Sequence, residues 1–122
     1  MNHLEAEIQE ACVRWFQYQY SHIGNLLFAV PNGGSRNKIE AVNLKRQGVT
    51  PGVSDLILFQ KRETYGALCI EMKAGKGTQS DAQKVWQKTV ERFGYKYVIC
   101  YSLEEFINEV NGYMNLGSYD RR

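Results

Sequence analysis

Two short segments decide the fold: Asp55-Leu56-Ile57-Leu58-Phe59 and Ala67-Leu68-Cys69-Ile70-Glu71-Met72-Lys73. Both have the length and apolar content of β-strands, and the polar stretch Lys61–Gly66 between them predicts a β-hairpin with a longer loop. Strand alternation in the second segment places Leu68, Ile70 and Met72 on one face, and Cys69, Glu71 and Lys73 on the other. A hairpin pairing would bring Asp55 beside Glu71.

The rest of the chain alternates helical and strand patterns. Expected helices are Leu4–Tyr20, Arg36–Gln47 with Gly48 as C-cap, a segment after Gly77 with Gly94 at its C′ position, and one opened by the capping box Ser102–Glu105. The apolar stripe of the first helix is Leu4, Ile8, Ala11, Cys12 and Trp15. Expected inward residues of the last two helices are Ala82, Val85, Trp86, Val90 and Phe93, then Phe106, Ile107 and Val110. Strands are expected at Leu26–Val30 and Tyr95–Tyr101. The order α-β-α-β-β-α-β-α predicts an α/β fold, a mixed sheet flanked by helices.

Composition limits the function classes. The 122 residues predict one domain, residues 1–114, with a polar tail at 115–122. The net charge of +2 neither requires nor opposes a nucleic-acid partner. Three cysteines without a close pair indicate buried thiols, not a disulfide framework or a zinc site. With no secretion signal and no apolar stretch long enough for a membrane span, we expect a soluble cytoplasmic protein.

The predicted neighbours Asp55 and Glu71 carry the chemistry. Two ionised carboxylates held close together repel each other, and a divalent cation such as Mg²⁺ removes that repulsion. A cation there would lower the pKa of a bound water, and Lys73 would neutralise charge growing on a phosphate. The alternative is an ordinary solvated Glu-Lys pair on an exposed strand face.

The chain resembles the VRR-NUC family, a branch of the PD-(D/E)XK nuclease superfamily with a restriction-endonuclease-like core. The resemblance extends from Glu5 to about Val110. It rests on Pro31-Asn32-Gly33-Gly34, Leu44-Lys45-x-x-Gly48-Val49, Gly52-Val53-Ser54-Asp55-Leu56, Glu71-Met72-Lys73, Gln83-Lys84 and Gly94-Tyr95. Six short motifs in the family's order are specific, although each alone is not. The superfamily often has proline where this chain has Ser54.

The resemblance implies roles for individual residues. Asp55 and Glu71 match the metal-binding acids, Lys73 the catalytic lysine, and Gln83 a glutamine that helps to hold water or phosphate. The backbone carbonyl of Met72 is a further metal ligand by the same resemblance. The family's N-terminal helix supplies another acid, which corresponds to Glu5, with Glu7 left open as a competitor.

By resemblance we also expect Mg²⁺, with Mn²⁺ as a substitute, and no organic cofactor. Single-domain relatives from phages and bacteria act as homodimers on branched DNA such as four-way (Holliday) junctions. The expected function is therefore a structure-specific endonuclease in a bacterial or phage-infected cell. Two alternatives stay open: a DNA-binding module with little turnover, and a nuclease directed at RNA.

Candidate DNA contacts are Asn32, Gly33, Arg36, Lys38, Lys45 and Lys76. Small residues such as Gly33 let backbone N–H groups approach phosphate, and basic side chains bind it. The alternatives are a turn that needs positive φ at the glycines and an ordinary solvated helix face for the basic residues. Gly75-Lys76-Gly77-Thr78 lacks the spacing of a nucleotide-binding loop. The helix Leu4–Tyr20 carries more aromatic residues than a core needs, so part of that set is a candidate dimer surface or base-stacking patch.

Overall fold

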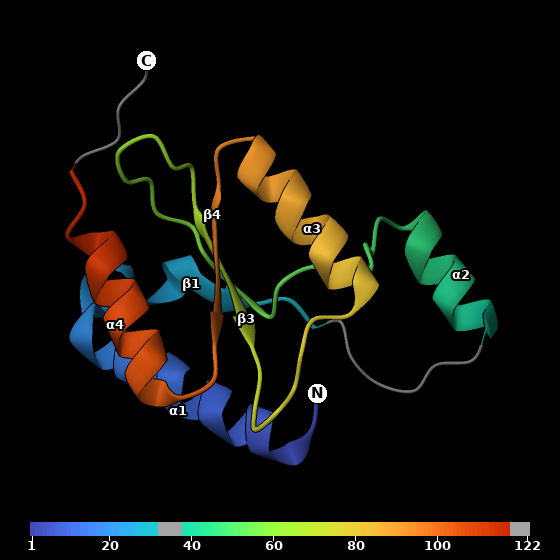
Figure 1. The fold of residues 1–122 in the computed structure, drawn as a ribbon, viewed down its shortest axis with the longest axis horizontal. Coiled ribbons are helices and arrows are strands. Elements are labelled where there is room, and N and C mark those ends of the chain that lie inside the picture. The colour runs from blue at the N-terminus through green and yellow to red at the C-terminus, as the bar shows by residue number, and fades with distance from the viewer. Residues whose placement is uncertain (32–37, 118–122) are drawn as a thin grey trace.

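The computed structural model describes residues 1–31 and 38–117, with Lys38 through its backbone only, and contains a four-stranded mixed sheet (Figure 1). The strands β1 (Leu27–Ala29), β2 (Leu56–Leu58), β3 (Leu68–Met72) and β4 (Lys96–Cys100) lie in the order β1-β2-β3-β4. The β1–β2 and β2–β3 pairs are antiparallel, and β3–β4 is parallel. The predicted hairpin is therefore confirmed.

Helices lie on both faces of this sheet. One face is covered by α1 (His3–Gln19) and α4 (Leu103–Met114), which contact each other, while α3 (Asp81–Arg92) packs on the other face against β4 (Figure 1). The α3 helix is the crossover that a parallel β3–β4 pair requires. A short 3₁₀ helix, η1 (Ser21–Leu26), joins α1 to β1 and was not predicted.

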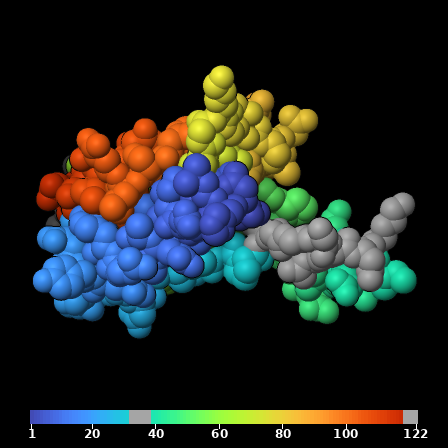
Figure 2. All heavy atoms as spheres, turned by 90° about the horizontal axis from the view of Figure 1, so that it is seen from below, coloured from blue at the N-terminus to red at the C-terminus, as the bar shows by residue number. Residues whose placement is uncertain are grey.

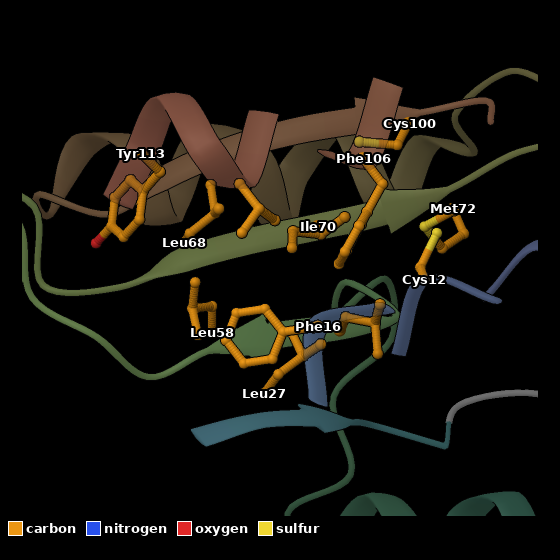
Figure 3. Close-up of a cluster of buried hydrophobic side chains, with 12 residues drawn as sticks. Cys12, Phe16, Leu27, Leu58, Leu68, Ile70, Met72, Cys100, Phe106 and Tyr113 are labelled. Carbon is orange, nitrogen blue, oxygen red and sulfur yellow. The ribbon is translucent and has the colours of Figure 1, made fainter. Parts of the chain in front are cut away.

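The larger hydrophobic core lies between the sheet and the α1–α4 layer. Leu68, Ile70 and Met72 of β3 pack there against buried residues of α1 and α4, among them Phe16 and Phe106 (Figure 3). Cys69 belongs instead to a smaller cluster with Val90 and Tyr97 under α3. The two clusters confirm the predicted alternation of β3, with apolar residues buried on both faces.

The prediction that Leu4, Val85 and Phe93 face inward is wrong. Leu4 is 53% exposed, Val85 64% and Phe93 68%. Leu4 lies at the first turn of α1, and Phe93 is the C-cap of α3, so both extend beyond the covered part of the sheet. Since α3 packs mainly on the edge strand β4, only a narrow stripe of the helix with Val90 is buried.

The remaining helix, α2 (Lys38–Arg46), stands away from the rest of the molecule (Figures 1 and 2). Its exposed apolar residues include Ile39 and Val42. The predicted glycines after α2 and α3 adopt positive φ, +102° at Gly48 and +92° at Gly94. At α4 the capping box is only half made, because Glu105 accepts from the Tyr101 N–H.

Cys12, Cys69 and Cys100 are free and buried, as expected. Burial raises the pKa of the Cys12 and Cys100 thiols to about 12, so both stay protonated near neutral pH. Among the described helices, none is both long and apolar enough to span a membrane.

Candidate active site

The β2–β3 hairpin brings the two predicted acids together. Leu56 pairs with Ile70, so the antiparallel register continued by one residue places Asp55 opposite Glu71. The Asp55 Oδ2 atom accepts a hydrogen bond of 2.7 Å from the backbone N–H of Met72. This bond fixes the Asp55 carboxylate at the end of β3, although Asp55 itself lies just before β2.

Glu71 is a buried carboxyl in an unfavourable environment. It is 1% exposed, and its Oε1 atom has no hydrogen-bond partner among the described residues. Burial, and after it the neighbouring Asp55 carboxyl, raise the pKa of Glu71 from 4.5 to about 9, while the Lys73 ammonium opposes them. The alternative of a solvated Glu-Lys pair on an exposed strand face is therefore excluded for Glu71, because β3 is buried on both faces.

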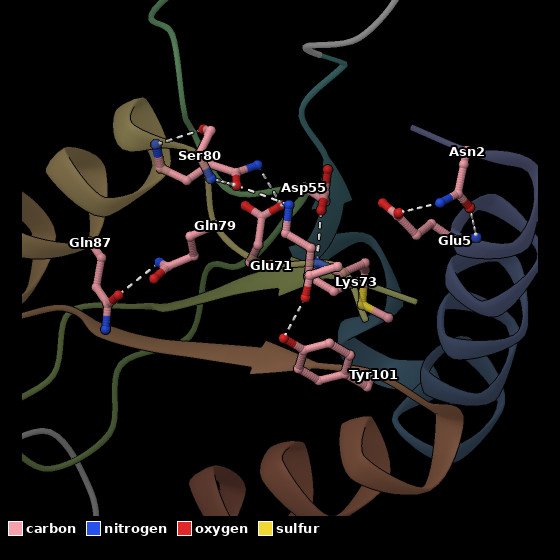
Figure 4. A network of polar contacts seen from close by, with 12 residues as sticks. Asn2, Glu5, Asp55, Glu71, Lys73, Gln79, Ser80, Gln87 and Tyr101 are labelled. Carbon is pink, nitrogen blue, oxygen red and sulfur yellow. Dashed lines mark hydrogen bonds and ion pairs between the residues drawn. The ribbon is translucent and has the colours of Figure 1, made fainter. Parts of the chain in front are cut away.

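Lys73 and Gln83 complete a polar network around Glu71. The Lys73 Nζ atom donates to Gln83 Oε1 at 2.9 Å, and Gln83 Nε2 donates to Glu71 Oε2 at 3.0 Å. The direct distance from Lys73 Nζ to Glu71 Oε2 is 4.0 Å, too long for a hydrogen bond. Figure 4 shows Asp55, Glu71 and Lys73 close together at the end of β3.

These side chains line a cavity of about 430 Å³ that opens between α1, the sheet and the start of α3. Glu5 and Gln9 line it from α1. The Glu5 carboxylate accepts from Asn2 Nδ2 at 2.6 Å and points toward Asp55 (Figure 4). Glu7 does not line the cavity and contacts His3 instead, so of the two acids left open, α1 turns Glu5 to the site.

The other predicted contacts are more scattered. Lys45 lines a groove between α2 and the segment Val49–Gly52, and Lys76 is exposed on the loop between β3 and α3. Asn32, Gly33, Arg36 and the side chain of Lys38 lie outside the described residues. Tyr18, from the aromatic set of α1, is 87% exposed, whereas Phe16 is buried.

Two features of the site were missed in the sequence. Ser80 and Gln83 form a full capping box at the start of α3, and the Ser-x-x-Gln spacing is the signal that identifies it. Gly52, with φ of +81°, lies so close to α3 that a Cβ atom there would collide with the carbonyl of Ala82. This close approach holds the Asp55 segment against the helix that carries Gln83.

The donor set fits a hard divalent cation. Asp55 and Glu71 offer carboxylate oxygens, and the unpartnered Glu71 Oε1 is a buried acceptor that a cation would satisfy. Within residues 1–31 and 38–117, no three His, Cys, Asp or Glu side chains form a metal-binding group. The two acids would therefore be completed by backbone oxygen or water, as is usual for Mg²⁺.

Comparison with known proteins agrees with this geometry. The VRR-NUC domain model matches residues 4–104. The chain belongs to the VRR-NUC family. It is also similar to a solved structure described as a VRR_NUC domain protein, at 27% identity over 98% of this chain and 95% of that chain, with a TM-score of 0.84. A search of curated proteins finds no match.

VRR-NUC membership makes this chain a member of a nuclease family, with DNA as the substrate and a divalent metal as the general requirement of such nucleases. The expected fold class is confirmed as well. The mixed four-stranded sheet flanked by helices is compatible with a restriction-endonuclease-like core.

Proposed function

We propose that this VRR-NUC protein is a Mg²⁺-dependent endonuclease, with Mn²⁺ as a substitute, that cuts structured DNA and prefers four-way junctions. The observation that carries the proposal is the convergence of Asp55, Glu71, Lys73 and Gln83 in the lining of one cavity. A binding module would have no need for a buried, unpartnered carboxyl oxygen at this place.

Each residue has a role that its position supports. Asp55 and Glu71 would hold the cation, with the Met72 carbonyl as a further ligand and Glu5 as an additional acidic ligand from α1. When bound, the cation lowers the pKa of a water and withdraws charge from the scissile phosphate. Lys73 stabilises the negative charge that develops on the phosphate oxygens, and Gln83 orients Lys73.

Phosphate contacts outside the cavity are assigned to α2 and to the loop before α3. Pro31 and Gly52 line both the cavity and the groove beside α2, so a DNA strand in the cavity would continue past Lys45. Lys76 is exposed on the loop between β3 and α3 and is the proposed contact from that loop. Asn32, Gly33, Arg36 and Lys38 are proposed contacts from the sequence alone, since the first three residues and the Lys38 side chain lie outside the described part of the chain.

A homodimer is part of the proposal because two sites related by a two-fold axis can nick both strands of a symmetric junction. The surface that supports it lies on the sheet, where α3 leaves the β1–β2 half of one face open. Phe28 is 43% exposed there and Phe59 66%, and both line an apolar pocket together with Tyr95 and Trp86. An aromatic area of this kind is typical of a protein interface. We assign it to a second copy of this chain, in the cytoplasm.

The direct test of the chemistry is Asp55→Asn in a cleavage assay on labelled junctions with Mg²⁺. Asparagine retains an oxygen that can accept the Met72 N–H, so we expect normal folding and junction binding. Cleavage should fall by at least about a hundredfold, because the cation loses a charged ligand. Cleavage by the variant at the wild-type rate would show that the cavity is not the active site.

A further inference from the structure

The capping box of α3 is connected to the site residues. Ser80 Oγ accepts from the Gln83 backbone N–H at 3.2 Å, and the Ser80 N–H donates to Gln83 Oε1 at 2.8 Å. A capping box normally serves only the helix that it begins. Here the same Gln83 side chain continues to Lys73 and Glu71.

The orientation of the Gln83 amide is over-determined. Its oxygen accepts from two donors, the Ser80 N–H and the Lys73 ammonium, while its nitrogen donates to the Glu71 carboxylate. A flipped amide would place its NH₂ group against both donors and its oxygen against the carboxylate. Only one orientation satisfies all three neighbours.

This orientation keeps the Lys73 ammonium apart from the Glu71 carboxyl. The Gln83 oxygen holds the Lys73 ammonium 4.0 Å from Glu71 Oε2, so the two do not close into a tight ion pair. Glu71 Oε1 stays without a hydrogen-bond partner among the described residues, and Lys73 keeps two of its three donors for other acceptors. Without a fixed amide, the ammonium would compete with a cation for Glu71.

We propose that Ser80 is a positioning residue of the nuclease site: its cap fixes Gln83, and Gln83 holds Lys73 apart from Glu71. The inference rests on the proposed function for its catalytic consequence. Its structural basis, the Ser80–Gln83–Lys73 connection, is independent of that function. Ser80 itself is not expected to touch the substrate's reacting atoms.

The chain provides a matched control at the start of α4. Ser102 Oγ accepts from the Glu105 backbone N–H at 3.1 Å, so it has the same capping role as Ser80. Neither Ser102 nor Glu105 lines the cavity. Loss of either serine hydroxyl should therefore destabilise the protein by a similar amount, but only one loss should disturb the site.

The kinetic experiment compares Ser80→Ala, Ser80→Thr and Ser102→Ala in single-turnover cleavage and in junction binding. We expect Ser80→Ala to slow cleavage about tenfold with binding within about twofold, because misplaced groups reduce rate more than affinity. Ser80→Thr retains the cap and should restore the rate, and Ser102→Ala should cleave like wild type. Equal rates for Ser80→Ala and Ser102→Ala would overturn the proposal. If Ser80→Ala does not fold, Ser80→Gly removes the same hydroxyl with a smaller loss of cap stability.

A second readout needs neither metal nor activity. The side-chain NH₂ resonances of Gln83 in the metal-free protein can be assigned by their loss in Gln83→Glu. We expect them to move toward solvent-exposed values in Ser80→Ala and to stay in place in Ser102→Ala. Unchanged resonances in Ser80→Ala would overturn the positioning role. Failure of the wild type to cut any DNA would instead contradict the proposed function, and the resonances would still decide the role of Ser80.

Discussion

In the metal-free protein, the Glu71 side chain has an unfavourable environment for a charged group. A carboxyl that is 1% exposed, with one oxygen unpartnered among the described residues and another carboxyl beside it, destabilises the fold when it ionises. The same features make it a strong ligand once a cation is present. The stability of the fold and the proposed chemistry therefore both depend on the Glu71 carboxyl group.

This imbalance predicts a pH dependence for the metal-free protein. The pKa of Glu71 is raised from 4.5 to about 9, so the folded state binds the proton more tightly than the unfolded state does. The free energy of unfolding should consequently fall as pH rises between these two values. Glu71→Gln removes the titration, and at pH 8 in EDTA we expect it to stabilise the protein by at least about 1 kcal/mol.

Chemical denaturation of both proteins across this pH range measures the effect. Millimolar Mg²⁺ should stabilise the wild type at pH 8 and have little effect on Glu71→Gln. Identical pH profiles for the two proteins would show that Glu71 ionises without difficulty in the fold.

Among the elements, α2 is the one that stands apart from the rest of the molecule. It carries Lys45 and Arg46 in its last turn, and Lys45 lines the groove that leads to the cavity. We expect Lys45→Ala to weaken junction binding and to reduce the slope of log K against log salt by about 0.9, as one lost phosphate contact predicts. Binding titrations at several salt concentrations measure this slope.

Lys61→Ala is the control for this charge change. Lys61 is also exposed but follows the end of β2 opposite to Asp55, so its loss should leave the slope unchanged. An equal change for both lysines would mean that α2 does not contact the DNA specifically.

The sequence predicted which helices and strands form better than it predicted which side of each helix is buried. The β2–β3 hairpin and the caps at Gly48 and Gly94 follow from local chemistry, and all were expected correctly. Exposure of Val85 on α3 depends on how much of the sheet that helix covers, which is a tertiary property. The unpredicted η1 helix likewise has no strong local signal.

The same division applies to the site. Glu71 and Lys73 are recognisable because a buried strand rarely carries charges, and Asp55 because a hairpin would place it opposite. The direction of Glu5 required the position of α1, which sequence periodicity alone does not give. The connection from Ser80 through Gln83 required both the helix start and the end of β3 in three dimensions.

For the whole molecule, the exposed apolar area around Phe28 and Phe59 predicts a homodimer. We expect the protein to be a dimer in solution and Phe59→Glu to yield a monomer, because a charge in an apolar interface loses its hydration without a partner. Sedimentation equilibrium measures the mass. Tyr18 is 87% exposed on α1, which covers the opposite face of the sheet, so Tyr18→Glu should leave the dimer intact.

These two variants distinguish the candidate surfaces. Dissociation by Tyr18→Glu alone would place the interface on the aromatic side of α1. A monomeric wild-type protein at the concentrations used for cleavage would contradict the dimer altogether.

The central claim is that the cavity with Asp55, Glu71 and Lys73 hydrolyses DNA with a divalent metal. The most direct measurement is cleavage of labelled four-way junction, flap and linear duplex with Mg²⁺, Mn²⁺ or EDTA, by wild type and by Lys73→Ala. We predict metal-dependent cutting that favours the junction and falls at least about a hundredfold in the variant. Tight junction binding without cutting under any metal, or equal cutting by Lys73→Ala, would contradict the account.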